Sequence, residues 1–306
     1  MVISSFEALK ARLQGLPPVP AVVAAAHDLH TLEAVFSAED NGLIEPLLVG
    51  HPDEIQTIAR QLGREVPLRR IVEAGDEKDC AKASVSLIRE GRGKLLIKGM
   101  MQTGSLLGAA VDRETGIRRA EVMSHVAILD VPSYHKLLYI TDGGMVIAPD
   151  LPQKRHILKN ALDLCRFLGY ERPKAAALCA VEVVNPHMIE TQDGAALKEE
   201  ALAGAFGPCL VEGPISLDLA TDPEAVKIKG YESPVAGDAD ILLAPSIAAG
   251  NLLGKSLYGL AGGLMAGVVL GASVPIVINS RGAAPEEKYD SILICSAMAA
   301  GAPPQV

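Results

Sequence analysis

The 306-residue sequence is poor in aromatic residues: it has no tryptophan, and phenylalanine and tyrosine together make up 3%. Unpaired bases stack on aromatic rings, so this scarcity argues against a protein that binds single-stranded nucleic acid. The net charge of −9 points the same way, because nucleic-acid binders carry an excess of positive charge. We therefore expect no nucleic-acid partner.

Cysteine is scarce as well, and no two cysteines form a C-x-x-C pair. The five are Cys80, Cys165, Cys179, Cys209 and Cys295. An odd, scattered set argues against a disulfide framework and against a zinc site, and it fits a reducing compartment. The first 16 residues contain no continuous apolar stretch of the kind found in signal peptides. We expect a cytoplasmic protein without a bound metal.

Charge is absent between Ser256 and Ser280. Four glycines recur there at every fourth position: Gly259, Gly263, Gly267 and Gly271. In a long apolar run this spacing is typical of a membrane helix face. However, Pro275 divides the run into a predicted helix of about four turns and a strand, each too short to span a bilayer. We favour the second interpretation and expect no membrane association.

Hydrophobic residues make up 49% of the chain and charged residues 21%, as in ordinary globular proteins. In the first third of the chain, strand patterns alternate with helical ones. Helices are predicted over 6–16, 30–41 (capped by Thr31), 52–62, 76–90 and 101–111, and strands over 21–26, 46–49, 70–73 and 94–98. Such alternation is typical of βαβ units and a mostly parallel sheet, so the predicted fold class is α/β.

Two strands follow each other directly between residues 121 and 147, which predicts an antiparallel element near a domain junction. Asp150 is placed to cap a helix that starts at Pro152 and ends near residue 169. Further along, strands are predicted over 175–184, 210–213 and 240–244, with helices over 195–205 and from residue 248.

The strongest candidate site is the segment 279–290, NSRGAAPEEKYD. It follows a predicted buried strand over 273–278 and contains a polar turn of Ser280, Arg281 and Gly282. A helix is predicted to begin directly after it, with a proline and two glutamates, including Glu287, in its first turn. Strand ends that open onto helix starts are where α/β proteins place ligands. An arginine there suits bidentate contact with phosphate.

Two other strand ends carry polar groups. The segment KGMMQTGS, which begins at Lys98 and contains Thr103, joins a strand to a helix. Its glycines and hydroxyls are compatible with an anion site at the helix N-terminus and equally with a simple helix cap. Asp142 lies in a glycine-rich turn, where it is either a ligand-binding residue or a turn former.

The segment AGNLLGKS at 249–256 nearly matches the phosphate loop G-x-x-x-x-G-K-[ST], but Ala249 replaces the leading glycine. Three interpretations remain open. The segment is a true phosphate loop, or Asn251 and Lys255 share a helix face that looks into a cleft, or Lys255 is simply solvated. The dinucleotide-binding pattern G-x-G-x-x-G and the hydrolase pattern G-x-S-x-G are both absent from the sequence.

Five segments together resemble the phosphate acetyl/butyryltransferase (phosphotransacylase) family, and the butyryl-type branch in particular. They are 98–111, 140–161, 181–188, 234–263 and 273–292. The likeness extends over nearly the whole chain from about residue 20. It implies the reversible reaction acyl-CoA + phosphate = acyl phosphate + CoA, by direct transfer in a ternary complex. The acyl group would be butyryl, acetyl or branched. The likeness implies no cofactor beyond coenzyme A as a substrate, and commonly a homodimer.

The resemblance also implies two α/β domains around a cleft, with a fold like that of isocitrate and isopropylmalate dehydrogenases. We expect residues 1–135 and 278–306 to form domain I, which contains both termini. Residues 136–277 would form domain II, with the active site in the cleft between the two.

Roles follow from the family pattern. Ser280 and Arg281 match its catalytic pair, and Glu287 matches its acidic base, for which Asp290 is the alternative. Acetyl-type members carry an arginine where this sequence has Leu106-Leu107-Gly108, so phosphate must find further positive charge elsewhere. The candidates for that charge are Lys98, Arg118 and Lys255. The expected substrate-binding residues are Lys98, Thr103, Asp142, Asn251, Lys255 and Gly282.

Two other classes of function stay open. One is a dehydrogenase-like enzyme that shares the fold and would need a metal-binding cluster of aspartates. The other is a non-catalytic protein that binds acyl-CoA or an anion.

Overall fold

The computed structural model describes residues 3–13 and 15–301. Their packing divides the chain into two compact units. Unit 1 consists of residues 3–9 and 124–265, and unit 2 of residues 10–123 and 266–301. The chain therefore passes between the units near residues 9, 123 and 265, whereas the expected domain boundaries were at 135 and 277. Each unit combines strands and helices and is described by itself.

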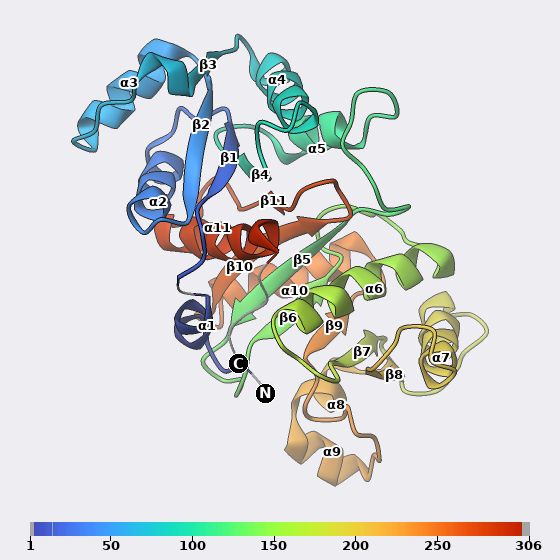
Figure 1. Ribbon diagram of the computed structural model, residues 1–306. Helices are drawn as coiled ribbons and strands as arrows, with labels where there is room; N and C mark the ends of the chain where they lie inside the picture. Colours follow the sequence, from blue (N-terminus) through green and yellow to red (C-terminus); the bar gives the residue numbers. More distant parts are fainter. Residues whose placement is uncertain (1–2, 14, 302–306) are drawn as a thin grey trace. The chain divides into compact units, whose positions relative to one another are not determined.

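The strands of unit 2 follow the order β3-β2-β1-β4-β11-β10 (Figure 1). They are β1 (Val19–Ala24), β2 (Ile44–Gly50), β3 (Ile71–Glu73), β4 (Leu95–Lys98), β10 (Leu264–Leu270) and β11 (Ile276–Val277). The first two residues of β10 fall in unit 1. All pairings from β3 to β11 are parallel, and only β10 runs antiparallel to its neighbour β11. The predicted, mostly parallel sheet is confirmed here.

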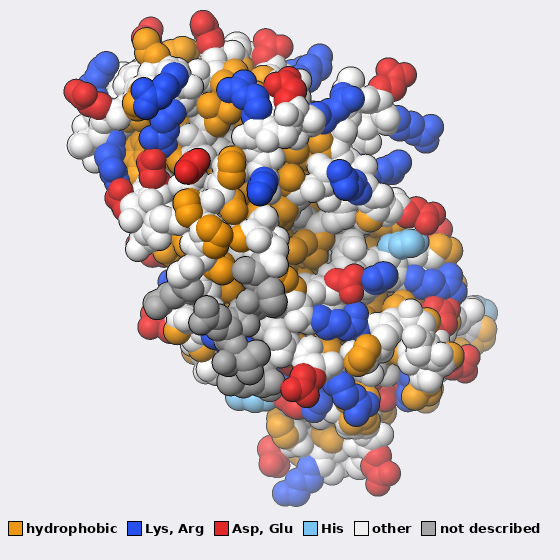
Figure 2. Space-filling model, in the orientation of Figure 1, with side chains coloured by type: hydrophobic (Ala, Val, Ile, Leu, Met, Phe, Trp, Pro, Cys, Tyr) orange, Lys and Arg blue, Asp and Glu red, His pale blue; other side chains and the backbone are white. Residues whose placement is uncertain are grey.

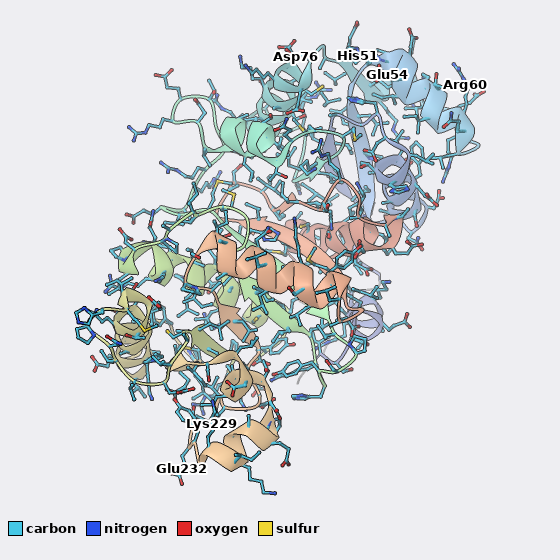
Figure 3. All side chains as sticks on the ribbon, turned by 180° about the vertical axis from the view of Figure 1, so that it is seen from behind. His51, Glu54, Arg60, Asp76, Lys229 and Glu232 are labelled. Carbon is cyan, nitrogen blue, oxygen red and sulfur yellow. The ribbon has the colours of Figure 1, made fainter. Side chains whose placement is uncertain are left out.

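Two of the helices of unit 2 begin at an aspartate that caps their first turn. The helices of this unit are α2 (Leu29–Asp40), α3 (Pro52–Gln61), α4 (Glu77–Arg89), α5 (Thr103–Val111) and α11 (Pro285–Ala300), with a short 3₁₀ turn η1 (Leu68–Arg70). Asp28 accepts a hydrogen bond from Thr31 N at 2.8 Å. Asp76, labelled in Figure 3, accepts two from the first turn of α4. The predicted cap Thr31 was wrong, since it lies inside α2 and Asp28 accepts the bond from its N–H.

Unit 1 contains the strand order β5-β6-β9-β7-β8. The strands are β5 (Ser124–Asp130), β6 (Leu138–Thr141), β7 (Lys174–Leu178), β8 (Leu210–Ile215) and β9 (Ile241–Leu243). β5 is antiparallel to β6, as predicted, and the other pairs are parallel. Each strand contributes to a buried apolar cluster that includes Leu129, Ile140, Ala176, Ile215 and Leu242.

Five helices belong to unit 1: α6 (Leu151–Phe167), α7 (Ile189–Leu202), α8 (Leu217–Thr221), α9 (Pro223–Lys229) and α10 (Ile247–Gly259). A further helix, α1 (Phe6–Arg12), contains the point at which the division between the units falls. The predicted cap of α6 is confirmed: Asp150 accepts from Gln153 N at 2.8 Å, and the Gln153 side chain accepts from Asp150 N at 3.0 Å.

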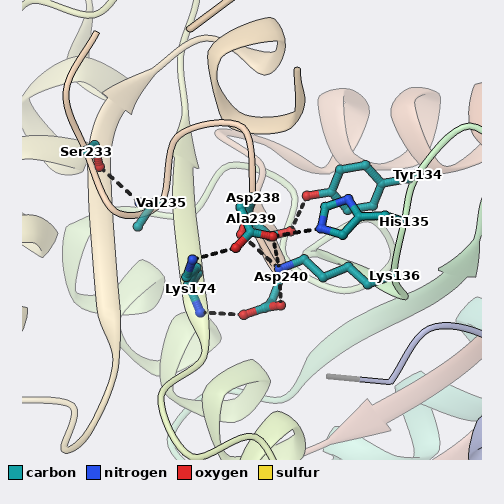
Figure 4. A network of polar contacts seen from close by, with 9 residues as sticks. All are labelled: Tyr134, His135, Lys136, Lys174, Ser233, Val235, Asp238, Ala239 and Asp240. Atoms are coloured by element: carbon teal, nitrogen blue, oxygen red, sulfur yellow. Dashed lines mark hydrogen bonds and ion pairs between the residues drawn. The ribbon is translucent and has the colours of Figure 1, made fainter. Parts of the chain in front are cut away.

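A buried ion network ties β6, β7 and β9 of unit 1 together at the start of each strand (Figure 4). The Lys136 side chain is 2% exposed, and its ammonium lies 2.8 Å from Asp238 and 2.6 Å from Asp240. Lys174 and His135 also contact Asp238. Burial alone would raise the pKa of Asp238, but hydrogen bonds from Lys136, Lys174 and His135 hold it well below its usual range. Removing one partner would therefore leave a buried charge uncompensated.

Two predictions of secondary structure were wrong, and one pair of helices was missed. The strand predicted over 175–184 ends at Leu178. The helices α8 and α9 were not predicted. The run from Ser256 to Ser280 is not a four-turn helix plus a strand, because α10 ends at Gly259 and β10 begins at Leu264. Gly262, with φ of 68°, makes the turn that separates them, and the valines of LMAGVVL favour the strand. Within residues 3–13 and 15–301, no helix combines the length and apolar character needed to cross a membrane.

Candidate active site

The parallel strands β1, β4 and β11 of unit 2 end at one edge of the sheet. Asp28 follows β1, Lys98 is the last residue of β4, and Arg281 follows β11. Because the strands are parallel and adjacent, these residues lie at the same edge, although up to 253 positions separate them in the sequence. The carboxyl edge of such a sheet is where α/β proteins bind ligands.

Lys98 is a buried lysine, 4% exposed, and its ammonium donates to Gly99 O at 3.2 Å and to Met101 O at 3.1 Å. Burial lowers the pKa of this ammonium to about 8, with a smaller contribution from the positive charges of Lys288 and Arg281. Lys98 was predicted as a substrate-binding residue. The positive charges of Lys288 and Arg281 lower its pKa further, whereas the negative charges of Asp28 and Glu77 act in the opposite direction.

Gly99 brings the loop after β4 against the end of β1. Its N–H bonds to Ala24 O at 2.8 Å. A Cβ on Gly99 would lie 2.4 Å from Ala25 O and 2.7 Å from Ala24 O, so no other residue fits without a backbone shift. Ala25 itself has a φ of 52°, in the left-handed region that few non-glycine residues occupy. Backbone strain of this kind often accompanies functional sites.

The turn after β11 presents Ser280, Arg281 and Gly282 to solvent. It is closed by a hydrogen bond from Ala283 N to Ser280 O at 3.1 Å. Asn279, 6% exposed, anchors the turn by donating to Ser291 Oγ of α11 at 2.9 Å. The predicted exit from a short strand through a polar turn into a helix is confirmed, with α11 beginning at Pro285.

The two candidate bases lie in different surroundings, although both are buried. Glu287 lies in the first turn of α11, and its carboxylate accepts from Ala284 N at 3.0 Å, directly beside the Ser280–Gly282 turn. Asp290 lies one turn further on and forms an ion pair with Lys10 of α1 at 2.9 Å. The carboxylate of Glu287 therefore caps the start of α11, two residues beyond the polar turn.

Three charged residues at this edge were not predicted: Asp28, Lys288 and Glu77. Lys288 of α11 is 4% exposed, donates to Thr31 Oγ1 at 3.0 Å and lies 3.9 Å from Asp28. Glu77 of α4 accepts a hydrogen bond from Ser105, and this bond is the main cause of its lowered pKa. The charge of Arg281 contributes to the same effect. In the sequence Lys288 and Glu77 show only helix periodicity, so no local pattern marks them.

The helix α5 starts at the same edge, and Thr103 is its first residue. Its N-cap residue, Gln102, makes no side-chain capping hydrogen bond. The N-terminus of a helix attracts anions through its N–H groups and its dipole. Together with Lys98 and Arg281, the start of α5 makes this edge of unit 2 suitable for a phosphate group.

The remaining predicted residues lie in unit 1. Asp142 is 2% exposed, and its carboxylate accepts hydrogen bonds from Gly144 N, Met145 N and Val146 N at 2.8, 2.9 and 3.2 Å. It therefore holds the loop after β6 in shape. Asn251 of α10 donates to Gly143 O in that loop at 3.0 Å, and Lys255 is exposed one turn further along α10.

The near match to a phosphate loop lies inside a helix. Residues 250–256 belong to α10, which begins at Ile247 with Ser246 as its N-cap. Their backbone N–H groups point along the helix and cannot form a phosphate cradle, so this segment is not a phosphate loop. The two other interpretations, a shared helix face that looks into a cleft and a solvated Lys255, are both compatible with the exposed side chains of Asn251 and Lys255.

Arg118, the third cation considered for phosphate, is exposed in unit 2, where its backbone forms a bridge with Ala272. Among the residues that the structure describes, no group of three or more histidine, cysteine, aspartate or glutamate side chains is arranged to hold a metal ion.

These features place the chain among α/β proteins that collect polar and charged groups at the carboxyl edge of a parallel sheet. The family model for phosphate acetyl/butaryl transferase matches residues 76–296. The chain belongs to this family, which confirms the resemblance found in the sequence.

Two curated relatives match almost end to end. The phosphate butyryltransferase of Clostridium acetobutylicum is 36% identical, over 97% of this chain and 99% of the relative. The phosphate acetyltransferase of Rhizobium meliloti is 39% identical, over 97% of this chain and 94% of the relative. The butyryltransferase and the acetyltransferase therefore have similar sequence identity to this chain.

Solved structures agree with the fold. A branched-chain phosphotransacylase from Enterococcus faecalis V583 has a TM-score of 0.76 at 30% identity, covering 92% of this chain and 98% of the other. A putative 4-hydroxythreonine-4-phosphate dehydrogenase from Salmonella typhimurium has a TM-score of 0.51 at 13% identity, covering 92% and 99%. The second likeness concerns the fold alone. The predicted fold class, α/β and related to dehydrogenases, is confirmed.

Proposed function

We propose that the protein is an acyltransferase that moves a short-chain acyl group reversibly between coenzyme A and inorganic phosphate. Membership of the family and near full-length similarity to two such transferases support this function. In the structure, the proposal rests on the groups at the carboxyl edge of the parallel sheet in unit 2. There the buried ammonium of Lys98 and the exposed guanidinium of Arg281 lie beside the start of α5.

Phosphate, or the phosphoryl group of an acyl phosphate, binds at this edge in the proposed mechanism. Arg281 contacts its oxygens bidentately, and the buried ammonium of Lys98 contributes a second positive charge. Thr103 and the first N–H groups of α5 add donors. Ser280 donates to the phosphate or to the carbonyl oxygen of the acyl group. Gly282 keeps the turn open on the solvent side, where a Cβ would meet nothing within 4 Å.

In the direction that consumes coenzyme A, Glu287 accepts the thiol proton and the thiolate attacks the carbonyl carbon of the acyl phosphate. A carbon–sulfur bond forms, the carbon–oxygen bond to phosphate breaks, and the electron pair leaves with phosphate. Arg281 stabilises the negative charge on the oxygens as it develops. A free thiol has a pKa of about 8.5, so a neighbouring base and cation both favour the thiolate.

Glu287 is the proposed base because its carboxylate caps the start of α11, two residues beyond the polar turn. The Asp290 carboxylate is paired with Lys10 of α1. Proton transfer requires hydrogen-bond reach of the reacting group, so position decides between two carboxylates of similar intrinsic pKa.

The test is phosphate-dependent release of the coenzyme A thiol from acetyl-, butyryl- and isobutyryl-CoA. Absence of release with every short acyl group would contradict the transferase and leave the non-catalytic binding protein. Arg281→Ala should lower kcat/KM for phosphate by about a hundredfold or more, because a charged donor to the reacting group is removed. Arg113→Ala, at an exposed arginine in the turn after α5, is the matched control and should match the unmodified protein.

The proposal includes Asp142, Asn251 and Lys255 as substrate-binding residues of unit 1, of which Lys255 is the exposed cation. Lys255→Ala should raise KM if it contacts a substrate anion. The reaction as written needs no metal and no bound organic cofactor, so dialysis against a chelator should leave the rate unchanged.

We also propose that the protein works as a homodimer, as the family resemblance implies, and in the cytoplasm, as the scattered cysteines indicate. Light scattering after size-exclusion chromatography distinguishes a single chain of 32.0 kDa from a pair. Fractionation of cells that express the protein tests the compartment.

A further inference from the structure

Two lysine ammonium groups are buried at the carboxyl edge of unit 2. Lysine and arginine side chains are spread over the face of the molecule that Figure 2 shows, where water solvates their charge. Lys98 of β4 and Lys288 of α11 differ from these, since each is 4% exposed. Burial disfavours the charged form of a lysine unless an opposite charge lies close by. A carboxylate that offsets this cost is therefore expected in their surroundings.

Asp28 provides that carboxylate beside Lys288. The Lys288 ammonium donates a hydrogen bond to Thr31 Oγ1 at 3.0 Å and lies 3.9 Å from Asp28 Oδ1. Thr31 is 1% exposed, and the side chain of Asp28 is 15% exposed. The pair is thus largely shielded from water, and opposite charges attract each other more strongly there than at the surface.

The two oxygens of the Asp28 carboxylate differ in their contacts. Oδ1 accepts a hydrogen bond from Thr31 N at 2.8 Å and so caps α2. Oδ2 is buried, and no donor in the described part of the chain forms a hydrogen bond with it. A buried carboxylate oxygen without a hydrogen bond is costly. Nearby positive charge offsets that cost, so Oδ2 acts on the lysines through its charge.

The position of the Lys98 ammonium depends on the backbone. It donates to Gly99 O at 3.2 Å and to Met101 O at 3.1 Å. A charged lysine has three N–H groups, and a neutral one retains two. Both hydrogen bonds can therefore be made in either state. The contacts that hold Lys98 in place do not decide whether it carries the third proton, and that decision falls to the charges around it.

Asp28 and Lys288 act on Lys98 in opposite directions. Lys98 pairs with Ala24 of β1, and Asp28 follows that residue by four positions. Burial is the main reason why the pKa of Lys98 is lowered to about 8. The positive charge of Lys288 acts in the same direction as burial, and the negative charge of Asp28 opposes both.

Two other charged groups act on Lys98. Arg281, in the turn after β11, lowers its pKa, and Glu77 of α4 raises it. Arg281 is exposed, and Glu77 accepts a hydrogen bond from Ser105. Asp28 and Lys288 are the opposed pair that the interior of unit 2 encloses.

We propose that Asp28 and Lys288 are positioning residues that set the charge on Lys98, Asp28 by keeping the third proton on its ammonium and Lys288 by opposing it. This assignment rests on the proposed acyl transfer, in which Lys98 supplies positive charge for phosphate. The pair acts through Lys98 and needs no contact with a substrate atom. Phosphate brings negative charge to the same edge and adds to the effect of Asp28, so Lys98 holds its proton more firmly when phosphate is bound.

Titration of the two lysines tests this role without catalysis. Isotope-labelled lysine side chains are followed by NMR as the pH is raised, and the two signals are assigned by their loss in Lys98→Met and Lys288→Met. In Asp28→Asn both titration midpoints should fall, by about half a pH unit or more, because an opposite charge is lost. In Lys288→Met the midpoint of Lys98 should rise, because a like charge is lost. Asparagine caps a helix as well as aspartate does, so Asp28→Asn keeps the start of α2.

The opposite directions distinguish this role from a merely structural one. Asp28→Asn and Lys288→Met break the same pair, so a structural role would move the Lys98 midpoint in the same direction in both or leave it unchanged. Either result would refute the proposal. Thr31→Val is the matched control, because it removes the hydroxyl that Lys288 contacts and changes no charge; its Lys98 midpoint should equal that of the unmodified protein. Circular dichroism checks the folding of each variant, and if one does not fold, the direction of the other decides.

Kinetics separate failure of this assignment from failure of the proposed function. The alkaline decline of kcat/KM for phosphate should move to lower pH in Asp28→Asn and to higher pH in Lys288→Met, while KM for acyl-CoA stays unchanged. Unchanged titration of Lys98 in both variants, with transfer activity present, would refute the role of the pair while the transferase stands. Absence of transfer in the unmodified protein would refute the transferase, and the NMR titration would still decide what sets the charge on Lys98.

Discussion

The charge of Lys98 should make the stability of the protein depend on pH in a defined window. Burial lowers the pKa of Lys98 from its ordinary value of 10.5 to about 8. Between these pH values the unfolded chain holds a proton on Lys98 that the folded chain has released. Raising the pH through this window therefore favours the folded state. The difference between the two pKa values corresponds to about 3 kcal/mol.

The variant Lys98→Met removes this dependence. The free energy of unfolding of the unmodified protein minus that of the variant should rise by about 1.4 kcal/mol per pH unit between about pH 8 and about pH 10. Below this range the difference should be constant, because Lys98 is protonated in both states. Urea unfolding followed by circular dichroism at several pH values measures it, and groups common to both proteins cancel in the subtraction.

Lys94→Met is the matched control, since Lys94 is exposed at the other end of β4. Its difference from the unmodified protein should stay flat over the same range. A flat profile for Lys98→Met as well would refute the reasoning, because a buried ammonium with a lowered pKa cannot be removed without changing the slope.

Three further changes test other parts of the structure. Lys136→Met should cost about 3 to 5 kcal/mol in urea unfolding, because it leaves the buried carboxylate of Asp240 without its ion partner. Gly99→Ala should cost about 3 kcal/mol, because its Cβ meets the backbone of β1, whereas Gly104→Ala should be neutral or stabilising. Glu287→Gln should lower kcat for acyl transfer by about a hundredfold or more, and Asp290→Asn should not; the reverse result would make Asp290 the base.

Those parts of the fold with strong local patterns were predictable from the sequence. The alternation of strand and helix up to residue 111, the cap of α6 by Asp150 and the start of α11 at Pro285 all depend on neighbouring residues. The short helices α8 and α9 and the strand β10 were missed. β10 is an uncharged run with regularly spaced glycines, which fits a close-packed helix and a buried strand equally well; pairing with β11 decides between them.

The candidate site was predictable where its residues are close in sequence and not where topology brings them together. Ser280, Arg281 and Glu287 lie within one turn and the helix start that follows it. Glu77 and Lys288 reach the same edge from α4 and α11, which only the strand order β1-β4-β11 makes neighbours. The role of each residue depends on its burial and on its distances to the others, and a local sequence pattern predicts neither.

The order in which the chain is synthesised has a consequence for this edge. Unit 2 is made from an early segment and a late one, and the late one supplies β11, which lies between β4 and β10. Until β11 emerges from the ribosome, β4 is an open edge strand of a four-stranded sheet, and such edges invite aggregation. The whole segment 124–265 of unit 1 is synthesised in the meantime. During synthesis, unit 1 is therefore complete before unit 2. Arg281 joins the edge of unit 2 only when β11 has inserted between β4 and β10.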